Sequence, residues 1–157
     1  MKLEIAGNRV LLRPLRLSDA PDIYRNINHP DIVRWTLSIP HPYTRNFAEK
    51  FIRKAQRHLR GKHEYIFGIV LRETGKIIGV TGLHEIDWDN GNAELGYWIA
   101  QNHWGKGLTV EAVALICEFG FAELQLRRIY ACLFDKNVQS RRVLEKSGFQ
   151  LEGRFRD

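Results

Sequence analysis

The sequence predicts an α+β protein of one domain, in which a mixed, mostly antiparallel sheet carries helices on both faces. Its 157 residues are the usual size of a single domain. Hydrophobic residues make up 44% and charged residues 27%, which excludes a disordered chain, a collagen-like repeat and a long coiled coil. Strand-type and helix-type patterns follow one another as strand, helices, three strands, helix, strand, helix, strand. We therefore expect residues 1–157 to form one domain around its own core.

The first quarter of the chain is predicted to hold a strand and two short helices. Residues 9–15 (RVLLRPL) have the composition of a strand. Ser18-Asp19 is typical of a helix cap, and Pro21 suits the first turn of the helix that follows. A second short helix is predicted over 31–35, before Pro40-His41-Pro42 interrupts the chain.

A longer helix is predicted between Thr44, which can cap its start, and Gly61, which ends it. Apolar residues recur in it at helical spacing: Phe47, Phe51, Ile52, Ala55 and Leu59. Its other face is basic and indicates a solvated surface, with contact to RNA or a ribosome as the alternative. The basic residues are Lys50, Arg53, Lys54, Arg57 and Arg60, with Lys62 just beyond.

Three strands should form an antiparallel meander over 64–71, 76–83 and 93–100. Residues 72–75 (RETG) predict the first hairpin turn. The second lies within 87–92 (DWDNGN), where Asn-Gly is the strongest short hairpin signal.

The last third is predicted to alternate helix, strand, helix and strand. The helices cover 107–121 and 138–146, and a strand rich in β-forming residues covers 128–134 between them. Ser147-Gly148 closes the second helix, and a last strand starts at Phe149.

Charge and cysteine content narrow the class of protein. The net charge of +6 favours anionic partners. Cys117 and Cys132 have no CxxC neighbour, so we expect no metal site and no disulfide framework, but two buried thiols in a reducing compartment. The sequence has no signal-peptide core and no apolar run long enough to span a membrane, so we expect a soluble, cytoplasmic protein with no membrane partner.

A glycine-rich segment over 102–109 (NHWGKGLT) lies between a predicted strand and a predicted helix. Gly105 and Gly107 let the backbone approach a ligand closely, and the helix start that follows favours anions. Val110 stands where a dinucleotide fingerprint needs a third glycine, and the order Lys106-Gly107 does not fit a P-loop. The segment therefore predicts either a pyrophosphate site of another kind or a glycine turn without a ligand.

Asn137 and Ser140 form a second candidate pair. They are three residues apart at a predicted helix start, so their side chains share a face. The alternatives are a plain N-cap for Asn137 and a solvated helix position for Ser140.

Together these segments resemble the GNAT superfamily of acyl-CoA-dependent N-acetyltransferases, and most of all its Rim-type enzymes, which acetylate ribosomal protein N-termini. The resemblance spans nearly the whole chain, with the elements in the same order. The matching stretches are Leu12-Arg13-Pro14-Leu15 with Ser18-Asp19-Ala20, Ala93-Glu94-Leu95-Gly96-Tyr97-Trp98-Ile99, Trp104-Gly105-Lys106-Gly107 with Glu111-Ala112, and Asn137-x-x-Ser140 through Gly148-Phe149.

The resemblance implies an acetyl-CoA cleft where the strand 93–100 splays from the strand 128–134. It assigns the pyrophosphate to backbone N–H groups of the glycine segment and the pantetheine arm to an added-strand pairing along the central strand. It also implies that an N–H near Trp98 holds the thioester oxygen and that Asn137 orders the cofactor. The implied cofactor-binding residues are Trp98, Ile99, Ala100, Gly105, Lys106, Gly107, Leu108, Thr109 and Asn137.

The implied reaction is direct attack of an amine on the thioester, which needs a base and an acid. Many family members use as acid a tyrosine seven residues after the Asn, but Leu144 stands there, so Ser140 is the expected acid. Glu94 is the expected base, with Glu85 and His84 as alternatives.

The sequence departs from the family pattern at two points. Asn102 replaces Gln or Arg, and the sequence stops at Asp157, where family members continue into one more strand. Either the C-terminal strand is shortened or the edge is completed differently.

The expected acceptor is the α-amino group of a protein, possibly ribosomal. The alternatives are a small amine (a polyamine, an amino acid or an aminoglycoside) or a nonenzymatic CoA- or RNA-binding module. We expect no nucleic-acid partner except through a ribosome, and a homodimer would be usual for the family.

Overall fold

The computed structural model describes residues 3–34, 39 and 43–156. Its elements run in the predicted order, except that one short strand is added at the N-terminus and the last predicted strand is not formed by residues 149–156. They are β1 (Ile5–Ala6), β2 (Val10–Pro14), η1 (Leu17–Asp19), α1 (Ala20–Ile27), α2 (Pro30–Val33), α3 (Arg45–Arg60), β3 (Tyr65–Leu71), β4 (Lys76–Asp87), β5 (Asn92–Ile99), η2 (Gln101–His103), α4 (Leu108–Ala122), β6 (Arg128–Tyr130) and α5 (Val138–Lys146).

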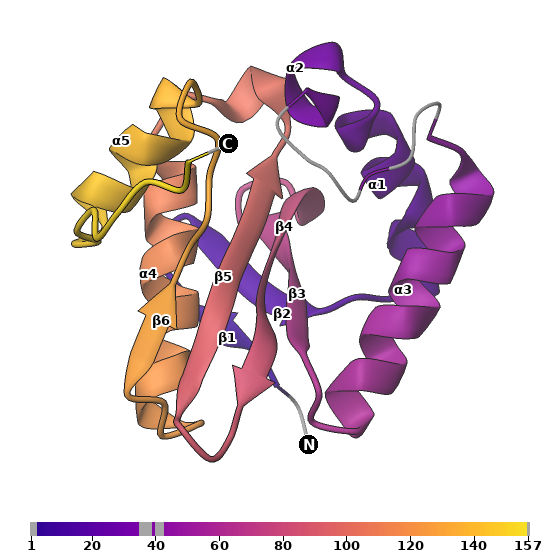
Figure 1. Ribbon diagram of the computed structural model, residues 1–157. Coiled ribbons are helices and arrows are strands. Elements are labelled where there is room, and N and C mark those ends of the chain that lie inside the picture. The colour runs from indigo at the N-terminus through magenta and orange to yellow at the C-terminus, as the bar shows by residue number, and fades with distance from the viewer. Residues whose placement is uncertain (1–2, 35–38, 40–42, 157) are drawn as a thin grey trace.

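The six strands form one sheet in the order β1-β2-β3-β4-β5-β6. Neighbouring strands are antiparallel from β1 to β5, and β6 pairs with β5 in parallel. Helices α4 and α5 lie on one side of the sheet and α1 and α3 on the other (Figure 1). The predicted fold class is confirmed, and so are the two hairpin turns, where Gly75 and Gly91 adopt positive φ.

The sheet separates two hydrophobic cores. One lies under α4 and α5 and includes Phe67, Leu83 and Ile116, which are fully buried. The other lies under α1 and α3 and includes Ile23 and Ile52. Burying a side chain of this size stabilises the fold by roughly 1.5–3 kcal/mol. None of the helices in the described ranges combines the length and the apolar character that crossing a membrane requires.

Helix α3 forms as the sequence predicts. The Thr44 hydroxyl accepts a hydrogen bond from the Phe47 N–H, and the helix ends at Arg60. Gly61 itself is right-handed (φ −81°), and the residue with positive φ is Lys62. Phe51, Ile52 and Ala55 of the predicted apolar stripe pack in the second core, and the basic stripe faces solvent. The prediction is wrong for Phe47, which is exposed, and Leu59 packs against the first core instead.

Three expectations near the N-terminus need correction. The first strand is shorter than predicted, Val10–Pro14, and an additional strand, β1, pairs with it. The second short helix is Pro30–Val33, and the predicted range beyond 34 falls outside the described residues, as does the 40–42 break. Asp19 does not cap α1 through its side chain, because other groups occupy its carboxylate.

The C-terminal part contains less strand than predicted. β6 ends at Tyr130 although β-forming residues continue to Phe134, and 149–156 form no strand. A strand needs a partner as well as a suitable composition, and within the described residues 131–134 have no neighbouring strand. Cys132 therefore lies beyond β6 and is exposed rather than buried, whereas Cys117 in α4 is half-buried, which raises the pKa of its thiol to about 11.

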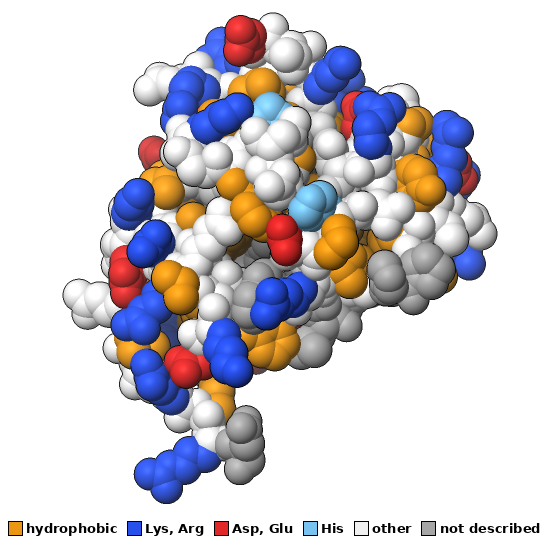
Figure 2. Space-filling view, turned by 90° about the horizontal axis from the view of Figure 1, so that it is seen from above, with side chains coloured by type: hydrophobic (Ala, Val, Ile, Leu, Met, Phe, Trp, Pro, Cys, Tyr) orange, Lys and Arg blue, Asp and Glu red, His pale blue; other side chains and the backbone are white. Residues whose placement is uncertain are grey.

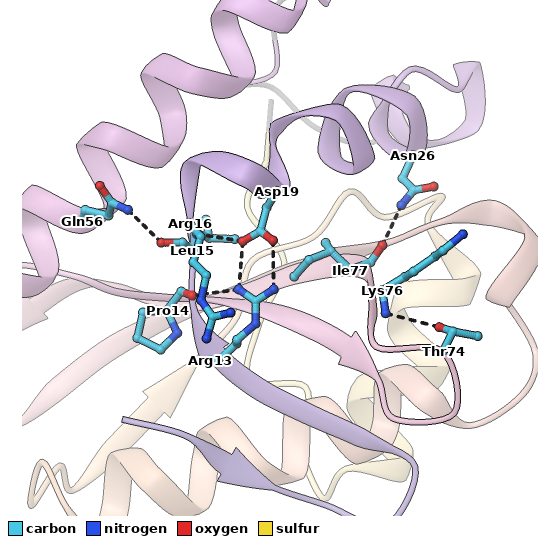
Figure 3. Close-up of polar contacts among 10 residues, drawn as sticks. All are labelled: Arg13, Pro14, Leu15, Arg16, Asp19, Asn26, Gln56, Thr74, Lys76 and Ile77. Carbon is cyan, nitrogen blue, oxygen red and sulfur yellow. Dashed lines mark hydrogen bonds and ion pairs between the residues drawn. The ribbon is translucent and has the colours of Figure 1, made fainter. Parts of the chain in front are cut away.

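A buried ion pair fixes the segment that links β2 to α1 (Figure 3). Two nitrogens of Arg13 donate to the two carboxylate oxygens of Asp19 at 2.9 and 2.8 Å, and the Arg16 N–H donates to the same carboxylate at 2.7 Å. Both side chains are at most 10% exposed. The hydrogen bond to Asp19 raises the pKa of Arg13. The pair satisfies a cation that would otherwise be buried alone.

Removing one partner of this pair should be strongly destabilising. We expect Asp19→Ala to lower the free energy of unfolding by about 3–5 kcal/mol, because Arg13 would remain buried without a counter-charge. Asp22→Ala, which removes an exposed pair with Arg25, should cost less than about 1 kcal/mol. Urea denaturation of the two variants measures both effects, and equal losses would contradict this role of Asp19.

Candidate active site

The edge of β5 loses its partner partway along the strand. Pairing with β6 covers Asn92 to Glu94 only, so the rest of that edge has no strand beside it in the described residues. On the other edge, pairing with β4 continues to Ile99, and the Ala100 N–H donates to the Ile78 carbonyl at 2.7 Å. Backbone groups alternate between the two edges of a strand. Those of Leu95, Tyr97 and Ile99 therefore face the open edge.

This alternation refines the expected pantetheine site. The backbone groups of Trp98 and Ala100 face β4, and only Ile99 of the three expected residues faces the open edge. The Ile99 carbonyl already accepts a hydrogen bond from the Trp104 indole nitrogen at 2.9 Å. Tyr97, for which the sequence predicted no role, offers both a free N–H and a free carbonyl.

The glycine segment that follows β5 has the backbone of an anion cradle. Gly105 and Gly107 have φ of 73° and 76°, and α4 begins directly afterwards at Leu108. No hydrogen-bond acceptor for the N–H groups of residues 105–110 occurs among the described residues. Six consecutive unpaired donors at a helix N-terminus suit an anionic ligand such as a diphosphate. The residues present therefore fit the cofactor that the resemblance implies.

The N-terminal strand holds this loop in place, a role that the sequence did not reveal. The Glu111 carboxylate in the first turn of α4 accepts hydrogen bonds from the N–H groups of Asn8, Arg9 and Val10 at 2.9–3.2 Å. The Arg9 guanidinium donates to the Lys106 carbonyl at 2.8 Å. Glu111 belongs to one of the stretches that resemble the GNAT superfamily. Nothing in the sequence spacing, however, connects it to residues a hundred positions earlier.

The end of the molecule around this loop is rich in cations. In the view from above, Lys and Arg side chains outnumber Asp and Glu (Figure 2). Lys106, Lys136, Arg141 and Arg142 are exposed. Burial, followed by the charge of Lys106, lowers the pKa of His103. A positive surface around free N–H donors favours a phosphorylated ligand.

Asn137 and Ser140 lie at the start of α5, as predicted. The Asn137 side-chain oxygen accepts a hydrogen bond from the Ser140 N–H at 3.1 Å, so Asn137 is the N-cap. The Ser140 hydroxyl lies 2.6 Å from the Tyr97 hydroxyl, and the Ser140 carbonyl lies 3.3 Å from it, so both Ser140 oxygens are within reach of the single phenol hydrogen. Burial raises the pKa of Tyr97, and the bond to Ser140 lowers it.

Glu94 lies on the opposite face of the sheet, together with His84. The two residues are directly paired across β4 and β5, so their side chains share the face that carries α1 and α3. Gly82 and Gly96, the next pair on this face, make room for the His84 ring, because a Cβ at either would lie 3.1–3.2 Å from His84 Nε2. The His84 ring therefore lies over the middle of the sheet, beside the strand that carries Glu94.

Glu64 holds two histidines on this face. Its carboxylate lies 2.8 Å from His58 Nδ1 and 3.4 Å from His84 Nδ1. Burial opposes the charge of Glu64, but the bonds to the two histidines outweigh it and lower the pKa of the carboxyl group. Among the described residues no three His, Cys, Asp or Glu side chains form a metal-binding group, and the contacts of Glu64 link the two histidines through one carboxylate.

Cys132 lies close to Glu94. Burial and then the Glu94 carboxylate raise the pKa of its thiol. The thiol is therefore protonated near neutral pH and is a poor nucleophile.

Two surface cavities lie at the end of β5 remote from the glycine segment. One of about 680 Å³ is lined by four carboxylates (Glu64, Glu85, Asp87 and Asp89) together with His58, His63, Ile86 and Trp88. The other, of about 540 Å³, shares His63 and Trp88 with it. The acidic cavity suits a cationic group, whereas the opposite end of β5 suits an anionic one.

Comparison with protein families and relatives gives one consistent result. The family model described as "Acetyltransferase (GNAT) domain" matches residues 9–150. The N-acetyltransferase p20 of Bacillus licheniformis, itself uncharacterized, is 34% identical over 149 residues, which are 95% of this chain and 83% of the relative. YdaF of Bacillus subtilis, provisionally named a ribosomal N-acetyltransferase, is 41% identical over 83 residues, 53% of this chain and 45% of the relative. Spermidine N(1)-acetyltransferase of Escherichia coli is 26% identical over 148 residues, 94% of this chain and 76% of the relative.

Solved structures agree on the fold. A crystal structure described as a probable acetyltransferase superposes with a TM-score of 0.87 at 29% identity, covering 96% of this chain and 85% of that one. The acetyltransferase MccE, solved with acetyl-CoA and AMP, superposes with a TM-score of 0.84 at 23% identity, covering 94% of this chain and 82% of that one.

The contacts of Glu64 with His58 and His84 should make the free energy of unfolding depend on pH in a defined direction. Because folding lowers the Glu64 pKa from its usual 4.5, its contribution is present above about pH 4.5 and is lost as the pH falls through the lower folded value. We expect Glu64→Gln to destabilise the protein at neutral pH and to differ less from wild type as the pH falls below 4.5. Thermal melting across pH measures this. Glu73→Gln, at an exposed turn position, should show no such convergence.

Proposed function

We propose the acceptor and the catalytic residues of this enzyme from one premise: the chain belongs to the GNAT family of N-acetyltransferases, which take the acetyl group from acetyl-CoA. The acceptor is the N-terminal α-amino group of a protein, a ribosomal protein in the first place. The amine attacks the thioester directly in a ternary complex.

One observation carries the proposal: candidate acid and base lie on opposite faces of the sheet, close to where β5 loses its partner. Ser140 belongs to the α4 and α5 face, and Glu94 to the α1 and α3 face. A thioester held along the open edge of β5 would have one group on each side. That arrangement allows the proton to leave the amine on one face and to reach the sulfur on the other.

The unpaired backbone N–H groups of the glycine segment and of β5 indicate which residues hold acetyl-CoA. The N–H groups of Gly105, Lys106, Gly107, Leu108 and Thr109 bind the pyrophosphate. The open edge of β5 binds the pantetheine arm as an added strand, with Trp98, Ile99 and Ala100 forming its wall. Asn137 keeps its amide nitrogen for the arm, since its oxygen is bonded to Ser140. The Tyr97 N–H, which faces the open edge, stabilises the thioester oxygen as charge develops.

The chemistry divides between Glu94 and Ser140. Glu94 takes the proton of the attacking amine, directly or through a water. As the new C–N bond forms and the C–S bond breaks, Ser140 gives its proton to the departing sulfur.

The charge distribution supports a protein acceptor within an RNA-rich particle. Helix α3 carries six Lys and Arg residues and one Glu, and therefore most of the chain's net charge of +6. All six are exposed, and no carboxylate of the described residues forms an ion pair with them. Such a surface attracts polyanions, while the acidic cavity near Glu94 accepts the ammonium terminus of a polypeptide.

A polyamine is the second candidate acceptor. The cavity with four carboxylates would also bind a small polycation, and one relative is named as a spermidine acetyltransferase. The two acceptors are distinguished by which amine is consumed.

A thiol-release assay with acetyl-CoA tests the acceptor. The panel contains a ribosomal N-terminal peptide, the same peptide with a blocked α-amino group, spermidine, free amino acids and an aminoglycoside. Release with the free peptide and none with its blocked twin supports the proposal, and mass spectrometry locates the acetyl group. Release with spermidine alone would move the proposal to the polyamine. If the protein binds CoA but releases no thiol with any amine, the result would indicate a nonenzymatic CoA-binding module.

Replacing Gly107 should weaken acetyl-CoA binding. A side chain there meets a positive φ, which costs about 1–2 kcal/mol, and its Cβ would lie 3.1 Å from the Arg9 guanidinium. We expect Gly107→Ala to raise the Kd of acetyl-CoA by about 5–30-fold, measured by calorimetry. Gly153→Ala, at an exposed position with open space around it, is the control and should leave the Kd unchanged.

Replacing Glu94 should slow turnover without unfolding the protein. We expect Glu94→Gln to lower kcat by about 100-fold or more, because a general base contributes 10²–10⁴. Glu85→Gln and His84→Gln are the matched comparisons on the same part of the sheet. A wild-type kcat for Glu94→Gln would show that Glu94 is not the base. A lowered kcat for Glu85→Gln or His84→Gln would instead assign the base to the residue replaced.

A further inference from the structure

We infer that the Tyr97 hydroxyl on β5 positions the Ser140 hydroxyl and replaces the proton that Ser140 gives to the leaving sulfur. This inference rests on the proposed function, because it takes Ser140 as the acid. Tyr97 would provide the phenol that many family members have seven residues after the Asn. At that position this chain has Leu144, which is buried.

The geometry joins the two hydroxyl groups closely. Tyr97 Oη and Ser140 Oγ are 2.6 Å apart, and the same phenol lies 3.3 Å from the Ser140 carbonyl. The Ser140 N–H is bonded to Asn137, so the serine is held from both sides. Ser140 is the only hydrogen-bond partner of the Tyr97 hydroxyl among the described residues.

The direction of the short hydrogen bond decides the chemistry. When the phenol donates to Ser140 Oγ, the serine hydrogen is free to point toward the open edge of β5. A serine hydroxyl alone is a weak acid, whereas a phenol titrates at about 10 and a thiol at about 8.5. A phenol behind the serine therefore brings the proton source closer to the acidity that a leaving thiolate requires.

The transfer balances as a two-proton relay. The amine nitrogen forms a bond to the acetyl carbon and loses a proton to Glu94, which releases it to solvent, and the C–S electron pair leaves with sulfur. Sulfur takes the Ser140 proton, Ser140 Oγ takes the Tyr97 proton, and the phenolate recovers a proton from solvent. Nothing is oxidised or reduced, and the products are the amide and the thiol.

The position of Tyr97 suits this task. Its side chain lies on the α4 and α5 face with Leu95 and Ile99, which are buried. Its backbone N–H faces the open edge of the same strand. One residue therefore lies next to both the thioester site and the acid.

The test is Tyr97→Phe, which removes only the hydroxyl and keeps the ring and the backbone N–H. With acetyl-CoA and an accepted amine, we expect kcat to fall about 10-fold or more while KM for acetyl-CoA stays within about 2-fold. With p-nitrophenyl acetate as acetyl donor, whose leaving group needs no proton, the variant should match wild type within about 2-fold. Added to Ser140→Ala, the substitution should cause no further loss, because the two residues act as a unit.

Tyr65→Phe is the matched control. Tyr65 is a buried tyrosine of the same core, and its ring contacts are with Trp88 and Phe119. It should leave the rates with both donors unchanged. An unaltered kcat for Tyr97→Phe, or equal losses with both donors, would overturn the relay while the proposed function stands. A wild-type protein that releases no thiol with any amine would overturn both.

A measurement on the intact wild-type enzyme covers the case in which Tyr97→Phe fails to fold. Two protons moving in the same step make the dependence of kcat on the deuterium fraction of the solvent curved. We expect this dependence to be curved with acetyl-CoA and to show no curvature with p-nitrophenyl acetate. A linear dependence with acetyl-CoA would overturn the relay.

Discussion

The whole site depends on one missing row of hydrogen bonds. β6 pairs with β5 over three residues and then leaves it, so that the far half of β5 keeps an edge with no strand beside it in the described part of the chain. Buried backbone groups without partners are costly, and an edge of this kind invites an added strand. The opposite edge of β5 is paired with β4 without interruption from Glu94 to Ile99, which keeps the free groups of this stretch at a regular spacing. A ligand with amide groups can therefore complete the sheet.

Alternation along β5 then determines which face of the sheet each side chain lies on and which edge each backbone group faces. Odd-numbered residues place their side chains under α4 and α5 and their backbone groups on the open edge, and Tyr97 does both. Even-numbered residues place their side chains under α1 and α3, where Glu94 faces His84. In the proposed mechanism the chemistry is thereby divided between the two sides of a sheet that also separates two apolar cores. A shift of one residue in register would exchange every role.

Local signals predicted the parts that neighbours in sequence decide. Helix α5 was predicted to the residue, and Thr44, Gly75 and Gly91 behave as their chemistry requires. What failed depends on partners elsewhere in the chain. The residues after Tyr130 have strand composition but no strand beside them, and the composition of a segment does not state its pairing. The links from Glu64 to His84, Glu111 to Arg9, and Tyr97 to Ser140 join distant segments, and a single sequence gives no spacing that connects them.

The net charge of +6 gives only part of the electrostatic description. The glycine segment at one end of β5 carries Lys106 and is contacted by Arg9, and four carboxylates line the cavity at the other end. A field divided in this way guides an anionic and a cationic substrate to different ends of one strand, and it repels each from the place of the other. The acetyl donor carries phosphates and the amine acceptor arrives as an ammonium ion. In the proposed mechanism the same division orients the two substrates toward each other, so that they meet near the point where β5 loses its partner.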